Sequence, residues 1–173
     1  MRDSSTQMPI PQKPEEVISL KIWHCKYSSF QNLYRFKNLK SLEIAAFPDS
    51  TLEVLGGLIN LTHLRIMHLP KINSLIPLVK LINLQYLSLS TLPSWDASRK
   101  VQMVDSLLPI CELPNLMHLE LFGVCDKTKS LRDIYKCQNL KTARFSRFKK
   151  GEVERICEEM NIEIGFNPKP FFQ

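Results

Sequence analysis

The seven-residue phrase Asn60-Leu-Thr-His-Leu-Arg-Ile66 indicates the fold class, because the chain repeats it with little change. Clear copies begin at Asn38, Asn83 and Asn115, and weaker ones at Glu16, Asn139 and Asn161. Inside each copy the apolar residues alternate with polar ones, which is typical of a strand. Just upstream they recur at every third position, as in Leu55, Leu58 and Leu61. Each unit is therefore predicted to be a helical or 3₁₀ arm that runs into a short strand.

The pattern LxxLxxLxNLxxLxL, with 22–24 residues per unit, resembles the short class of leucine-rich repeats from Glu16 to Gly165. The resemblance implies an α/β solenoid with a short-stranded parallel sheet on the concave side and helical or 3₁₀ arms on the convex side. One unit cannot bury its leucines alone, so stacked units would share a continuous core. The family usually places Asn or Cys shortly after each strand. This chain has mostly apolar residues there, namely Cys25, Phe47, Leu69, Leu92, Val124 and Phe148.

The repeat also divides the chain into segments. Residues 1–15 are a polar N-terminal segment, residues 16–165 form the repeat domain, and residues 166–173 are a C-terminal cap or tail. An insert at 94–106 lengthens one unit, and Val101, Val104 and Leu107 at helical spacing predict a convex helix led in by a loop around Trp95. The insert is either a functional loop or a tolerated surface insertion.

The C-terminal end has two interpretations. Residues 151–160 have the spacing of an amphipathic helix, and such a helix would cap the exposed end of a solenoid core. Alternatively, the last residues are a docking tail that binds a partner through Phe171 and Phe172.

Composition limits the class of protein. The 173 residues, 44% hydrophobic and 23% charged, suit one compact domain. No apolar run approaches the roughly 20 residues of a membrane-spanning helix, and the first residues do not resemble a secretory signal. The five cysteines contain no CxxC pair, which favours reduced thiols. We therefore expect a cytoplasmic protein without membrane contact.

Outward positions of the predicted strands form the candidate site. Because side chains alternate along a strand, the residues between the core leucines should line the concave face. Aromatic, Met and Arg side chains among mixed charges are typical of a protein-binding surface. The predicted partner-binding residues are Trp23, His63, Arg65, Met67, Tyr86, His118, Glu120 and Phe122.

Catalytic and metal sites are not predicted. His63 and His118 lie two units apart, about 10 Å at ordinary strand spacing, which is too far for one zinc ion. His24 and His68 have no obvious acidic or cysteine partner, and the chain lacks a glycine-rich phosphate loop. We expect neither enzymatic activity nor a cofactor.

The net charge of +6 is uneven, and a basic rim gathers near the last full unit. Its candidate residues are Arg144, Arg147, Lys149 and Lys150. Basic residues interleaved with aromatic ones can bind RNA. Here Phe145 and Phe148 hold core positions of the repeat, so nucleic acid is the less favoured partner.

These observations predict a non-enzymatic protein-binding module that is a monomer outside its complex. More loosely, the chain resembles immunity proteins of contact-dependent growth inhibition, which implies a cognate toxin, such as a nuclease, as the partner. The positive charge counts against this hypothesis, because nucleases are themselves usually basic. An adaptor that recruits a protein to a larger complex and an RNA-binding solenoid that uses the rim at 141–150 are the alternatives.

Overall fold

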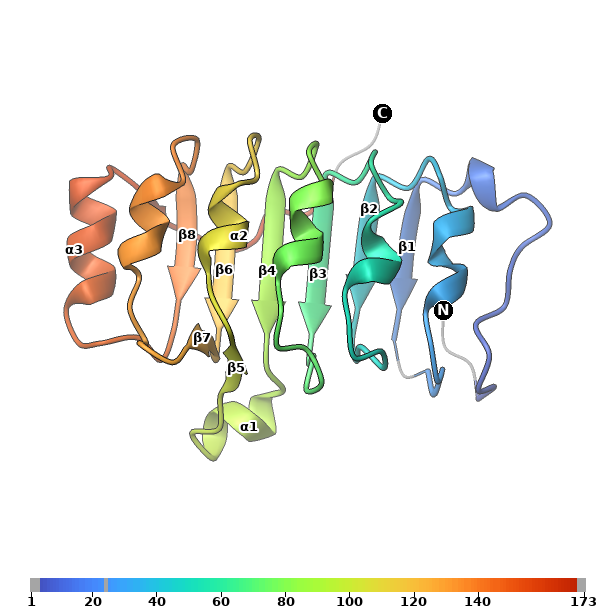
Figure 1. Ribbon diagram of the computed structural model, residues 1–173, viewed down its shortest axis with the longest axis horizontal. Helices are drawn as coiled ribbons and strands as arrows, with labels where there is room; N and C mark the ends of the chain where they lie inside the picture. Colours follow the sequence, from blue (N-terminus) through green and yellow to red (C-terminus); the bar gives the residue numbers. More distant parts are fainter. Residues whose placement is uncertain (1–3, 24, 171–173) are drawn as a thin grey trace.

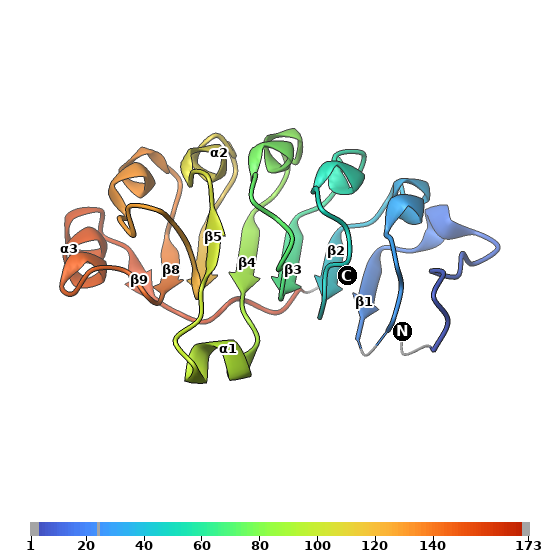
Figure 2. The same ribbon diagram turned by 60° about the horizontal axis from the view of Figure 1, so that its bottom comes forward.

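The protein is a curved parallel-stranded solenoid in a computed structural model that describes residues 4–23 and 25–170. Figures 1 and 2 show the strands along the concave side and the arms along the convex side. The seven strands of the main sheet lie in the order β1 (Ser19–Ile22), β2 (Ser41–Ile44), β3 (His63–Met67), β4 (Tyr86–Ser90), β6 (His118–Phe122), β8 (Thr142–Phe145) and β9 (Glu163–Ile164). The solenoid that the repeat predicts is confirmed.

Register follows from the repeat length. Ser41 pairs with Ser19 on one side and with His63 on the other, so equivalent positions of neighbouring units lie side by side. Leu64 and Ile66 of β3 point into the core and are at most 1% exposed. The same alternation in the neighbouring strands places all of their second and fourth residues in one hydrophobic core.

The convex arms show why the apolar residues recur in threes. A 3₁₀ helix has three residues per turn, so every third side chain faces the same way. Accordingly, the Leu58 N–H donates to the Leu55 carbonyl at 2.9 Å, and the Leu61 N–H donates to the Leu58 carbonyl at 3.0 Å. All three leucines are fully buried. The arms are η2 (Gln31–Arg35), η3 (Glu53–Leu55), η4 (Ile76–Lys80), α2 (Leu108–Cys111) and η5 (Arg132–Lys136), and η1 (Pro14–Glu16) precedes them.

A ladder of asparagine side chains joins neighbouring units along the edge where the strands begin. The Asn60 Nδ2 donates to the Lys37 carbonyl at 2.9 Å, and the Asn83 Nδ2 donates to the Ile59 carbonyl at 2.9 Å. Asn38, Asn115 and Asn139 make the equivalent bond. The asparagines at the start of these five phrases thus supply polar contacts between units.

The positions after the strands have the apolar packing that the sequence predicts. Phe47 is 2% exposed, and its ring packs edge-to-face on Phe30 with centroids 5.6 Å apart. Leu69 and Val124 are also buried. Among the thiols, Cys137 occupies a leucine position, and a hydrogen bond to the Cys111 sulfur together with burial raises its pKa. None of the five cysteines is in a disulfide.

The insert does not form the convex helix expected across Val101, Val104 and Leu107. Its first part is a short helix, α1 (Pro93–Ala97), at the end of the strands (Figure 1). Its second part is an extended strand, β5 (Gln102–Val104), which pairs with β7 (Val124–Asp126) in a separate two-stranded sheet. The Gln102 N–H donates to the Gly123 carbonyl at 2.8 Å. Hydrogen bonds to the neighbouring unit therefore override the local helical pattern.

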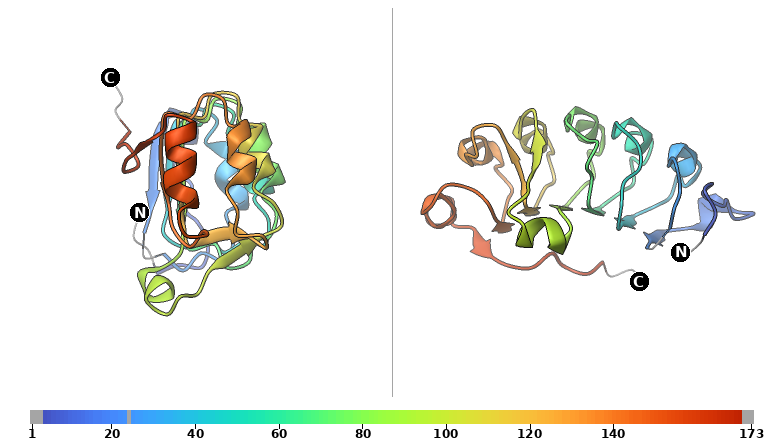
Figure 3. Two further views of the ribbon diagram at one scale, coloured as in Figure 1. Left: turned by 90° about the vertical axis from the view of Figure 1, so that its left-hand side faces the viewer. Right: turned by 90° about the horizontal axis from the view of Figure 1, so that it is seen from below.

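The C-terminal end combines a cap with a returning segment. Helix α3 (Glu152–Glu159) covers the last full unit with Ile156 and Cys157 buried, as the sequence predicts. After β9 the chain turns back and crosses the concave side of the sheet (Figures 2 and 3). Phe171 and Phe172, the residues of the docking-tail interpretation, lie outside the described residues. Within the described ranges, no helix has both the length and the hydropathy needed to cross a membrane.

Candidate functional site

The concave face carries the side chains in the columns that the sequence predicts. Strand pairing aligns His63 with Tyr86 and Tyr86 with His118 in one column. The second column aligns Arg65 with Ser88 and Ser88 with Glu120. Side chains 22 or more residues apart in the sequence therefore become direct neighbours across the sheet.

An ion-pair network spans the first three strands. Glu43 accepts from the Lys21 Nζ at 3.0 Å and from the Arg65 Nη1 at 3.3 Å, so one carboxylate holds two cations. The Lys21 Nζ also lies 4.6 Å from the centroid of the Trp23 ring. Such partly exposed pairs contribute at most about 1 kcal/mol each to stability. Their main consequence is to hold charged groups at defined positions on the face.

Half-buried aromatic and apolar side chains flank this network. The His63 ring stacks on Tyr86 with centroids 4.3 Å apart and planes inclined by 20°. Burial lowers the pKa of His63, which favours its neutral imidazole. Trp23 and Met67 line an apolar hollow of about 220 Å³, whose other lining residues are Ile22, Cys25, Ala45, Ala46 and Leu92.

His118 and Glu120 are on the concave side of the sheet but are buried, contrary to the expectation that they face a partner. The two residues are 0% and 6% exposed, respectively. The His118 Nδ1 lies 2.7 Å from the Thr142 Oγ1, and Glu120 accepts from the Ser88 Oγ at 2.8 Å. Burial lowers the pKa of His118, and the nearby Glu120 carboxylate partly opposes this effect. In this arrangement both side chains interact with neighbouring residues of the sheet.

The residues of the predicted basic rim lie on different sides of the molecule. Arg144 is part of the concave face, where its Nη1 lies 3.6 Å from the Glu120 Oε2 and its guanidinium lies 4.4 Å from the Phe122 ring centroid. Lys149 and Lys150 instead line a hollow of about 430 Å³ between η5 and α3. Arg147, in the connecting loop, has a left-handed backbone conformation with φ of 71°. The four residues therefore do not form one continuous strip.

The remaining histidines are not brought together. His68 packs edge-to-face on Trp95 of the insert, with centroids 5.0 Å apart, and His24 lies outside the described residues. Within residues 4–23 and 25–170, no group of three or more His, Cys, Asp or Glu side chains has the arrangement to hold a metal ion.

Sequence reasoning missed the contribution of the C-terminal segment to this face. The Phe166 ring centroid lies 4.4 Å from the Arg144 guanidinium, on which Phe122 also packs. Residues 167–170 line a second hollow, of about 330 Å³, together with strand residues that include Glu43 and Arg65. These residues follow the last repeat, and no periodic pattern relates them to the strands.

Comparison with known proteins identifies the fold. No family model matches the chain, and no curated protein matches its sequence. Among solved structures, an internalin C2 from Listeria monocytogenes aligns with a TM-score of 0.57 and 21% identity, over 76% of this chain and 53% of that one. The fold is therefore a leucine-rich repeat solenoid.

Two further structures align with lower scores. A leucine-rich repeat protein from Leptospira interrogans has a TM-score of 0.42 and 19% identity, over 88% of this chain and 49% of that one. An internalin from L. monocytogenes has a TM-score of 0.30 and 16% identity, over 79% and 56%. The chain spans about half the length of all three structures.

Proposed function

We propose that the chain is a non-enzymatic protein-binding module that holds its partner on the concave face of the sheet. The observation that carries the proposal is that three half-buried aromatic residues lie on the concave side of the sheet beside prearranged charges. Trp23, Tyr86 and Phe122 belong to the surface of the sheet and not to its core. Aromatic residues and Arg at such positions are the usual anchors of protein interfaces, because they bury a large area at a small cost in side-chain entropy.

The prearranged charges support specificity. Glu43 holds Lys21 and Arg65, and Glu120 holds Arg144, so the cations are already positioned before a partner arrives. Prearranged groups lose less conformational entropy on binding than mobile ones. The alternation of positive and negative groups would favour a partner with a matching pattern.

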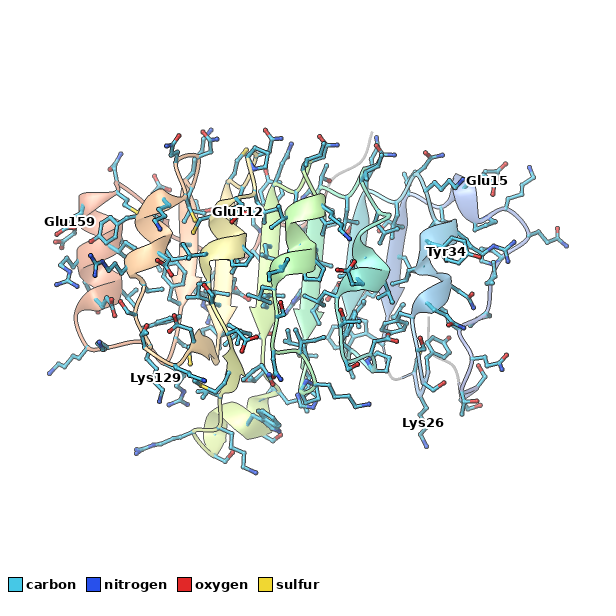
Figure 4. All side chains as sticks on the ribbon, viewed as in Figure 1. Glu15, Lys26, Tyr34, Glu112, Lys129 and Glu159 are labelled. Atoms are coloured by element: carbon cyan, nitrogen blue, oxygen red, sulfur yellow. The ribbon has the colours of Figure 1, made fainter. Side chains whose placement is uncertain are left out.

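Site-specific cross-linking in the cells that express this protein tests the proposal. A photo-reactive phenylalanine analogue at Tyr86 should give a covalent adduct of one defined size. The same analogue at Tyr34, which is 60% exposed on the convex arm η2 (Figure 4), is the matched control and should not give that adduct. An adduct from Tyr34 alone would place binding on the convex side and overturn the proposal.

Alanine substitution then measures the contribution of the anchors. Replacing Trp23, Tyr86 and Phe122 one at a time should weaken binding of the cross-linked partner by roughly 30-fold each, which corresponds to about 2 kcal/mol for a hot-spot residue. Circular dichroism of each variant should show an unchanged fold. Unchanged affinity in all three variants would contradict the proposal that the concave face binds the partner.

Neutralisation of a toxin inside the cell is a narrower form of the proposal, and the comparisons give it no support. It stays a prediction from the sequence, and co-expression with the product of the neighbouring gene tests it. Cells should survive that product when this protein is present and die when it is absent. Equal killing in both cases would exclude the immunity role and leave the broader proposal unaffected.

A further inference from the structure

The C-terminal segment Phe166–Pro170 takes a path that capping the solenoid does not require. Helix α3 already covers the last full unit, and β9 pairs with β8 at the edge of the sheet. Beyond β9 the chain nevertheless returns along the concave side, beneath β8, β6 and β4 and toward β2 (Figure 3). It thereby reaches the face proposed above for partner binding.

Two features of the segment suit a ligand of this face. Phe166 contacts the Arg144 guanidinium through the face of its ring, a cation–π contact. Pro168 and Pro170 fix their backbone φ angles, so the segment stays extended and has little conformational entropy to lose. Extended proline-containing peptides are recognised by other proteins for the same reason.

The segment is nevertheless poorly matched to the hollow that it covers. Among the described residues, no backbone–backbone hydrogen bond joins residues 166–170 to the strands, and the nearest one is from the Gly165 N–H to the Ala143 carbonyl. The Arg65 Nε and the Asn167 Oδ1 are both buried without a partner, although both residues line the same hollow. Burying such groups unpaired is unfavourable, so a ligand that pairs with the Arg65 Nε would bind the hollow better.

From these contacts we infer that the groove over β1, β2 and β3 recognises an extended, proline-containing segment of the partner protein. Residues 167–170 line this groove while Phe166 is anchored on Arg144 of β8, so the C-terminal segment acts as an internal substitute until the partner segment displaces it. The inference rests on the proposed function, since it names the chemistry of the partner on the same face. The partner segment carries an aromatic residue that packs on Arg144 and a carboxylate or amide oxygen that accepts from the Arg65 Nε.

A labelled peptide with the sequence of residues 163–173 is the probe, and fluorescence anisotropy with the full-length protein is the measurement. A tethered segment competes at an effective concentration in the millimolar range, so wild-type protein should bind the peptide weakly. The variant Phe166→Ser removes the anchor and should bind it roughly two- to fivefold more tightly, the range that an exposed cation–π contact supplies. Phe166 is 77% exposed, so the variant should keep its fold. Lys149→Ala, on the convex side, should bind as the wild type does.

Two substitutions test the predicted recognition. In the Phe166→Ser protein, a peptide with Asn167→Asp should bind roughly tenfold more tightly than the unchanged peptide, because a carboxylate forms a charge-assisted hydrogen bond with Arg65. Adding Arg65→Ala to that protein should abolish this difference. A scrambled peptide should not bind.

The outcomes separate the inference from the proposed function. Equal peptide binding by the wild-type and Phe166→Ser proteins, or none by either, would overturn the inference. Cross-linking from Tyr86 would still support partner binding at the face in that case. Conversely, tight peptide binding with no adduct from Tyr86 would refute the proposed function. The groove would then be shown to bind a peptide without being the site of partner binding.

Discussion

His118 occupies the strand position that the sequence predicts, but it is buried where the sequence predicts an exposed side chain. Its place in the first column is correct, since it pairs between Tyr86 and Thr142. However, it is fully buried, with its Nε2 unpaired and its Nδ1 against the Thr142 hydroxyl. Alternation along a strand determines the direction of a side chain. It does not determine what covers that side chain.

Burial of His118 predicts that stability depends on pH. Its pKa is lowered in the folded protein, while an unfolded histidine titrates near 6.5. Between these two values the unfolded chain binds more protons, so the free energy of unfolding should fall as the pH is lowered from 7.5 to 5. Urea titrations across this range measure the effect.

Two variants isolate the contribution of His118. His118→Gln should flatten the pH profile of the unfolding free energy, with His63 and His68 supplying the remaining slope in the same direction because their pKa values are also lowered by burial. Thr142→Val removes the hydrogen-bond partner but keeps the titrating imidazole, so the slope should remain. An unchanged slope in His118→Gln would exclude this histidine as the cause.

At the level of elements, hydrogen bonds between units prevail over local patterns. The asparagines that open each phrase join successive arms, and β5 is extended because it pairs with β7. Local spacing in the insert favours a helix, but the neighbouring unit offers partners for an extended backbone. The N–H and carbonyl groups of a buried backbone must form hydrogen bonds. Here the adjacent unit supplies partners that only an extended strand can reach.

Asn139 and its neighbour Gln138 provide a matched test of the asparagine ladder. The Asn139 Nδ2 donates to the Pro114 carbonyl at 2.7 Å. Asn139→Ala should therefore lower the free energy of unfolding by about 0.5–1.5 kcal/mol, the usual contribution of one hydrogen bond. Gln138→Ala, at an exposed position in the same turn, should have a smaller effect. Equal urea midpoints for the two variants would indicate that the ladder contributes nothing.

For the molecule as a whole, stability depends strongly on the two ends, because the units are stacked and each end lacks one neighbour. Each unit is covered by its neighbours, and the last full unit is covered by α3. In solenoids, stability is approximately the sum of unit terms and interface terms between adjacent units. A weakened end therefore exposes the core of the next unit.

Ile156 tests this dependence on the cap. It is fully buried at the centre of α3, so Ile156→Ala should destabilise the protein by about 2–5 kcal/mol in thermal or urea unfolding. Ile164→Ala is the control, because Ile164 lies close by in β9 but is 68% exposed, and its effect should stay within about 0.5 kcal/mol. Similar losses in both variants would contradict a capping role for α3.

The solenoid, the strand register and the columns of the concave face follow from the sequence alone, because a repeat of near-constant length places equivalent residues side by side. The sequence also located the capping helix, whose amphipathic spacing is local. The burial of His118, the extended insert and the return of residues 166–170 across the sheet (Figure 3) are visible only in the three-dimensional structure. These features depend on contacts between segments that no repeat relates, so periodicity in the sequence carries no information about them.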